Sequence, residues 1–76
     1  PSEKLTPGNN VKHLNRQAAI HFKAGEYRKA IELWKKSLSK NPDQRHLYRS
    51  IGVAYYELGE PKQARKYLNN SARGIE

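Results

Sequence analysis

The sequence predicts an all-α protein built from two tandem helical hairpins. Apolar residues recur at three- and four-residue steps through most of the chain, and glycine or proline separates the helical segments. No window of useful length alternates with a period of two, and the chain matches itself at a shift of 34 residues. These patterns favour a short α-solenoid of stacked hairpins.

Length and composition allow one small domain whose stability comes from packing. The 76 residues are 36% hydrophobic, with a mean hydropathy of -1.05, as expected of a thin structure with much surface. There are no cysteines, so neither disulfides nor thiolate zinc sites hold the chain together, and the composition fits reducing and oxidising compartments alike. No apolar run approaches the roughly 18 residues of a membrane-spanning helix. Because the chain opens with PSEKLTPGNN, we expect an excised or processed piece.

Four helices are expected after a short linker. Residues 1–9, with two prolines and a glycine, read as a linker, and residues 10–76 as the folded domain. Asn10 is a suitable N-cap. Gly25 and Gly59 end the helices that precede them, because glycine adopts a left-handed conformation at little steric cost. The expected helices span residues 10–24, 27–40, 43–58 and 61–73.

One amphipathic segment, residues 25–42, has three open interpretations. Its sequence GEYRKAIELWKKSLSKNP is basic and aromatic, so it could lie on a membrane, bind nucleic acid or pack within an array. The internal repeat favours the third interpretation, because Gly25 falls on Gly59, Glu26 on Glu60, Ala30 on Ala64 and Ser37 on Ser71. Its aromatic stripe, including Trp34, is therefore expected in the core.

The period and the residues resemble the tetratricopeptide repeat, a 34-residue helix–turn–helix unit. The second unit, residues 45–76, carries Tyr48, Ile51, Gly52, Tyr55, Ala64 and Leu68 at the signature positions. The first, residues 11–44, carries Leu14, Gln17, Ala18, His21, Ala30, Trp34 and Pro42. Gln17, His21 and Pro61 depart from the family pattern without changing the period.

Small residues at the expected helix crossings allow close packing. Ala18 should face Ala30 and Gly52 should face Ala64, with Trp34 and Leu68 filling the gaps between stacked hairpins. Ile20 and His21 are expected to widen the apolar stripe of the first helix. The last helix offers Tyr67, Leu68 and Ala72 with no following repeat, so we expect self-association through that face or a longer array.

Catalytic and metal chemistry find little support in the sequence. The three histidines, His13, His21 and His46, have no ligand spacing, and no phosphate loop or nucleophile elbow is present. Glu26, Glu57 and Glu60 lie near the turns and read as solvated surface. We expect a non-enzymatic scaffold without a cofactor.

The resemblance implies where a partner binds, because the family lines a concave groove with the first helix of each repeat. Carried over by repeat position, the groove residues are Lys12, Asn15, Arg16, Ala19, Phe22, Lys23, His46, Arg49, Ser50, Val53, Tyr56 and Glu57. The cations, the neutral donors Asn15 and Ser50, and the apolar wall of Phe22 and Tyr56 suit an acidic, extended peptide of another protein.

Lys12 and Arg16 lie four residues apart, so both can reach one carboxylate. Chaperone-binding members of the family hold a C-terminal carboxylate with a Lys and an Arg at this spacing. Those domains also use residues of two earlier repeats that this chain does not supply, so simple solvation is the preferred interpretation of the pair.

Net charge leaves a second partner class open. Fifteen Lys and Arg against seven Asp and Glu give a formal charge of +8. The alternative function is therefore binding of a polyanion, nucleic acid or anionic lipid, through the whole basic surface. It is the less favoured reading, because Trp34 and Tyr67 are expected in the core and no aromatic residues interleave with the exposed cations.

Overall fold

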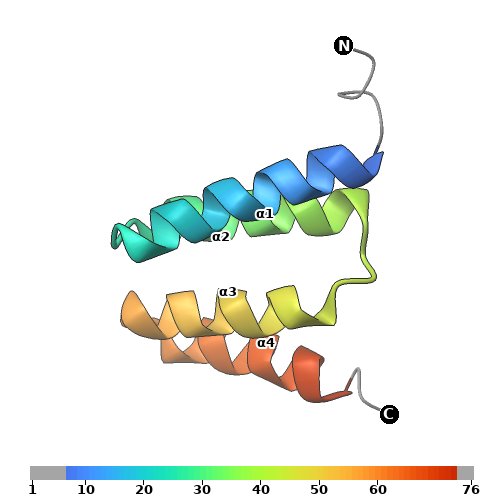
Figure 1. The fold of residues 1–76 in the computed structure, drawn as a ribbon. Coiled ribbons are helices and arrows are strands. Elements are labelled where there is room, and N and C mark those ends of the chain that lie inside the picture. Colours follow the sequence, from blue (N-terminus) through green and yellow to red (C-terminus); the bar gives the residue numbers. More distant parts are fainter. Residues whose placement is uncertain (1–6, 74–76) are drawn as a thin grey trace.

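The computed structural model describes residues 7–73, which form four α-helices arranged as two stacked hairpins (Figure 1). The helices are α1 (Pro7–Lys23), α2 (Tyr27–Lys40), α3 (Arg45–Glu57) and α4 (Pro61–Arg73). α1 packs against α2, α3 packs against α4, and α2 joins the hairpins by packing against α3. The all-α prediction and the expected bounds of α2 and α4 are confirmed.

The first helix begins earlier than the sequence suggested. Residues 7–9, expected in the linker, are helical, so Asn10 lies inside α1 and the prediction that it caps the helix is wrong. Proline is favoured at a first helical position, because its φ is already helical and its missing N–H needs no partner there. Residues 1–6 of the expected linker lie outside the described residues.

Both hairpin turns have the same backbone hydrogen bonds. Gly25 and Gly59 have φ values of 84° and 81°, as predicted. The Gly25 amide donates to the Phe22 carbonyl and the Glu26 amide to the His21 carbonyl, at 3.0 and 2.8 Å. The matching bonds around Gly59 and Glu60 measure 3.0 and 2.9 Å. This Schellman pattern satisfies the last carbonyls of α1 and α3, so each turn stays short.

The link between the hairpins is extended. Asn41 adopts φ −144° and ψ 97°, the geometry that a following proline favours. The Asp43 amide donates to Asn41 Oδ1 at 3.1 Å, and Gln44 is also extended, with φ −138°. This local turn keeps residues 43 and 44 out of the helix, so α3 begins at Arg45 rather than near Asp43.

Small residues let the helices of each hairpin approach closely. Ala18, Ala30 and Ala64 are fully buried, as expected. A Cβ atom added to Gly52 would lie 2.7 Å from Leu68 Cγ and 3.1 Å from the Ala64 carbonyl oxygen. Leu68 therefore fills the space over Gly52 within its own hairpin, and the expectation that it fills a gap between hairpins is corrected.

The core lies along the α2–α3 contact. Trp34, only 6% exposed, is buried with Ile31, Leu47, Ile51 and Tyr55. Ile20 is 54% exposed, so the prediction that it widens the apolar stripe of α1 is wrong: it projects away from α2. No helix among residues 7–73 is long and apolar enough to cross a membrane.

The face of α4 is less open than the sequence suggested. The Tyr67 ring stacks on Tyr48 and Tyr55, with ring centroids 6.2 and 5.6 Å apart, so it packs inward on α3. Leu68 is partly covered by its contact with Gly52. The side chain of Ala72 lies outside the described residues, and self-association through α4 stays a prediction.

Replacing Trp34 with alanine removes the largest side chain of the core. We expect the free energy of unfolding to fall by about 3–5 kcal/mol, because the lost ring leaves a cavity between α1, α2 and α3. Urea unfolding followed by circular dichroism measures the change, and Trp34→Phe is the milder variant for a marginally stable background. A loss below about 1 kcal/mol contradicts the buried position of the ring.

Replacing Gly52 with alanine tests the close approach of α3 and α4. The added methyl group meets Leu68, so we expect destabilisation of about 1–3 kcal/mol, more than the helix-propensity gain of about 1 kcal/mol. Because Leu68 supplies the clashing atoms, the loss in the Gly52→Ala/Leu68→Ala double variant should be smaller than the sum of the single losses. Additive losses would show that the two residues do not meet.

Candidate functional site

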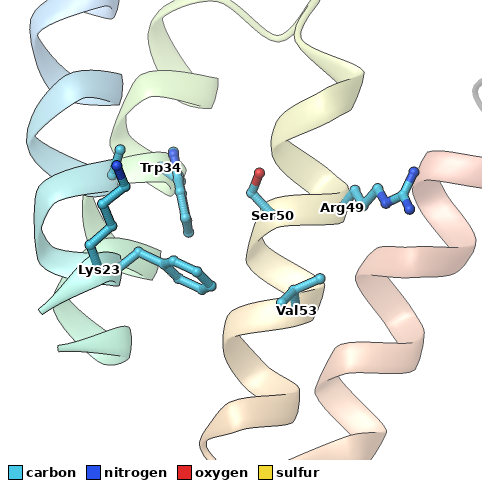
Figure 2. Close-up of a pocket in the computed structure, with 7 residues that line it drawn as sticks. Lys23, Trp34, Arg49, Ser50 and Val53 are labelled. Atoms are coloured by element: carbon cyan, nitrogen blue, oxygen red, sulfur yellow. The ribbon is translucent and has the colours of Figure 1, made fainter. Parts of the chain in front are cut away.

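A hollow opens between the two hairpins on the side of α1 and α3. It measures about 320 Å³ and is lined by residues of three helices: Ala19, Phe22, Lys23, Trp34, Arg49, Ser50 and Val53. In Figure 2 the indole of Trp34 stands on one side of the hollow, facing Ser50 and Val53 on α3. Six of the twelve sequence-predicted groove residues thus meet around one space.

The other predicted residues lie outside the hollow. Lys12, Arg16 and His46 are exposed on the same two helices. Tyr56 is 57% exposed and is not part of the lining, so the apolar wall consists of Phe22 with Trp34 and Val53. Trp34 was expected only in the core. Its size, larger than Leu68 at the equivalent position, is the signal that could have placed it at the surface of the groove as well.

The charged wall of the hollow belongs to α1. Lys12, Arg16, Ala19 and Lys23 follow one another at steps of four, three and four residues, so they lie along one stripe of the helix. We call them the α1 row. The equivalent positions of α3 hold His46, Ser50, Val53 and Glu57. Every charged residue of the α1 row is basic, because α1 contains no acidic residue. The equivalent α3 positions are polar and apolar and end in the acidic Glu57.

Arg49 takes a different direction from the one that the sequence suggested. It lines the hollow, yet in Figure 2 its guanidinium group extends away from the hollow toward α4. Its methylene groups therefore belong to the wall, while its charge does not face the α1 row. The cations of the groove are those of α1.

Asn15 and Ser50, predicted as neutral donors to a partner, both donate within the protein itself. The Asn15 amide donates to Gln44 Oε1 at 2.8 Å, and the Ser50 hydroxyl donates to the His46 carbonyl at 3.3 Å. Both donors are already engaged inside the protein. Asn15 Oδ1, however, is buried without a hydrogen-bond partner.

Gln44, directly before α3, anchors the start of the second hairpin to the first. Its amide nitrogen donates to the carbonyls of Asn41 and Ser37, at 2.8 and 3.2 Å, and to the Ser37 hydroxyl at 3.1 Å. With the bond from Asn15, the side chain joins α1, the end of α2 and the link in one buried network. Helical periodicity does not single out Gln44, and its position two residues after Pro42 is its local signal.

Two carboxylates near the turns lie at the exposed surface, as predicted, and each also has a partner. Arg28 donates to Glu60 across the hairpin boundary, with Nη2 2.7 Å from Oε2. Glu26 pairs with the ring of His21, and this hydrogen bond lowers the pKa of Glu26. The hydrogen bond that Arg28 donates to Glu60 raises the pKa of Arg28. His21 is thus partly buried and hydrogen-bonded to the turn that follows α1.

Lys35 is held against aromatic rings on the outer side of the molecule. Its ammonium nitrogen lies 5.6 Å from the ring centroids of both Tyr55 and Tyr67. Its interaction with the Tyr55 hydroxyl, and more weakly with Tyr67, raises the pKa of Lys35. Lys35 therefore contributes to the contact between α2, α3 and α4.

A second, shallow hollow of about 330 Å³ lies on α4 and is lined by long polar and charged side chains. Its lining consists of Lys62, Gln63, Arg65, Lys66 and Asn69. Within residues 7–73, no group of three or more histidine, cysteine or acidic side chains is placed to hold a metal ion.

Comparisons with known proteins agree with this geometry. A family model described as TPR repeat matches residues 18–59, and one described as Tetratricopeptide repeat matches residues 50–72. The BBSome complex member BBS4 of Bos taurus is 31% identical over 70 residues. The match covers 83% of this chain and 14% of the bovine protein, so the chain spans a small part of that relative.

Replacing Gln44 with alanine removes the shared partner of Asn15, Ser37 and Asn41. We expect the free energy of unfolding to fall by about 1–3 kcal/mol, because buried polar groups lose their hydrogen bonds. Thermal or urea unfolding measures the loss. Gln63→Ala, at an exposed position of α4, is the matched control and should change stability by less than about 0.5 kcal/mol. Equal effects of the two variants contradict a structural role for the network.

Proposed function

The chain belongs to the tetratricopeptide repeat family, and we propose that its groove binds an acidic, extended segment of another protein. Repeats of this family generally mediate protein–protein interactions and are typically non-enzymatic. The further statements, that the partner is acidic and that it lies between α1 and α3, are proposals drawn from the site.

The observation that carries the proposal is the α1 row, whose charged residues are all basic, beside a hollow lined mainly by apolar side chains. Lys12, Arg16 and Lys23 are exposed along one stripe of a helix that has no acidic residue to neutralise them. Such a stripe attracts negative charge, and its potential is complementary to carboxylates. The cations thus favour an acidic partner, and the hollow gives that partner a defined place.

The shape of the row favours an extended chain over a folded surface. Lys23 lies eleven positions after Lys12 on the helix, so the row is about 16 Å long. An extended chain advances about 3.3 Å per residue, and about five of its residues span the row. A single carboxyl terminus at Lys12 and Arg16 uses only one end of it.

The bovine relative gives independent support for a role in assembly. By its printed name it is a member of a complex, and the matching stretch covers most of the present chain. A segment that contributes an interaction surface to a larger assembly fits that relationship. The partner of the present chain is proposed from its own groove.

The second hollow favours the alternative function, polyanion binding over the outer surface. Lys62, Arg65 and Lys66 gather there without an acidic neighbour in the lining. Nucleic acid or an anionic membrane would use such charges without regard to the α1 row. Variants of the two surfaces distinguish the two functions.

Binding of an acidic peptide tests the proposed function. With a fluorescently labelled peptide of alternating glutamate and serine, we expect Lys12→Ala, Arg16→Ala and Lys23→Ala each to weaken binding by about two- to fivefold. Fluorescence anisotropy at fixed salt measures the dissociation constants. Lys36→Ala and Lys66→Ala are matched controls, because they remove the same charge from exposed positions outside the α1 row.

Lys35→Ala is unsuitable as a control, since it also removes the contact with Tyr55 and Tyr67. A single-stranded oligonucleotide serves as the competing polyanion. If the control variants weaken peptide binding as much as the α1 variants do, and the oligonucleotide binds equally well, the peptide-groove function is contradicted in favour of diffuse polyanion binding.

A further inference from the structure

We infer that the hollow receives one bulky apolar side chain of the bound segment, and that acidic residues flank this side chain on both sides. The inference rests on the proposed function and adds to it the sequence class of the partner. It follows from the lining, the rigidity and the charged surroundings of the hollow.

Most of the lining of the hollow is apolar. Phe22 from α1, Trp34 from α2 and Val53 from α3 surround it, and Ala19 leaves room because its side chain is small. Val53 remains 37% exposed, so apolar surface of the wall is still in contact with water. Covering that surface with an apolar side chain is favourable.

The apolar walls are held in place before any partner arrives. The Phe22 ring packs edge-on against Tyr27, with centroids 5.2 Å apart, and lies 5.8 Å from the Trp34 ring. Trp34 is itself nearly buried. A site whose walls are already fixed loses little conformational entropy on binding.

The size of the hollow suits a side chain. Its volume of about 320 Å³ lies at the small end of the range, about 300–1,000 Å³, that is typical of small-molecule sites. Its open side faces the groove, where the backbone of a bound segment would lie. A bulky aliphatic or aromatic residue can therefore enter while its own backbone remains outside.

Cations stand on both sides of this entrance. Arg16 and Lys23 lie three and four residues from Ala19 along the α1 row, at rises of about 4.5 and 6 Å. An extended chain covers these distances with one or two residues. The favoured segment therefore has an acidic residue within about two positions on each side of its apolar residue.

The chain carries its own reporter of this contact. Trp34 is the single tryptophan of the sequence and it lines the hollow. Its fluorescence changes when an apolar group displaces water from beside the indole, whereas charge contacts along α1 leave that environment in place. Emission thus reports occupation of the hollow separately from total affinity.

Three acidic peptides of equal length and charge test the inference with the intact chain. One has leucine at its centre between glutamates, one has serine at that position, and one has the leucine moved to its end. We expect the first to bind about tenfold tighter than the other two and to be alone in shifting the Trp34 emission. Equal affinities with no distinct shift would overturn the inference.

A pair of variants locates the preference. Val53→Ala removes apolar surface from the wall and should reduce the leucine-over-serine preference about threefold. Ile20→Ala removes exposed apolar surface away from the hollow and should leave the preference unchanged. Equal effects of the two variants contradict the assignment of the preference to the hollow.

The outcomes separate this inference from the function on which it rests. If the leucine-centred and serine-centred peptides bind with equal affinity, and their binding still depends on Lys12, Arg16 and Lys23, the groove function stands and the inference fails. If neither peptide binds, or if binding depends equally on Lys36 and Lys66, both fail.

Discussion

The close approach of the two helices in each hairpin is the constraint on which the other features depend. Ala18, Ala30 and Ala64 are fully buried, and Gly52 has no room for even one methyl group beside Leu68. Helices that pack this closely place Ile51 and Trp34 in the contact between hairpins, where these side chains bury most of their surface. A larger residue at any of these crossings would separate the helices and change the angle at which the second hairpin meets the first.

Polar contacts at both ends of the hairpin boundary complete the packing. At one end Gln44 joins Asn15, Ser37 and Asn41, and at the other Arg28 pairs with Glu60. The two contacts differ in how much they contribute to stability. The Gln44 network is largely buried, so its loss leaves unpaired groups, whereas the Arg28–Glu60 pair is exposed and screened by water. The buried network therefore has the larger part in setting the relative position of the hairpins, and with it the width of the groove.

Equivalent positions of the two repeats carry different side chains along the proposed groove. The stripe that carries Lys12, Arg16, Ala19 and Lys23 on α1 carries His46, Ser50, Val53 and Glu57 on α3. Because the scaffold leaves both stripes accessible, their chemistry can vary without disturbing the core. The charges of the α1 stripe are all basic, whereas the α3 stripe is mixed and ends in the acidic Glu57, and Trp34 lines the hollow with both helices. A partner that combines negative charge with an apolar residue satisfies both walls at once.

The sequence by itself determined the helices, the turns and the repeat, because these depend on local rules. The left-handed conformation at Gly25 and Gly59, the extended Asn41 before Pro42, and the burial of Ala30 and Trp34 follow from residue type and spacing. The repeat pattern also predicted that α1 and α3 line the proposed groove. Only the tertiary structure decided how individual side chains are used. Asn15 bonds to Gln44, Arg49 turns toward α4, and Tyr67 packs inward, since each choice depends on neighbours from another helix. Residues distant in the chain become neighbours only after the hairpins have packed, so no periodicity within one helix could have placed them.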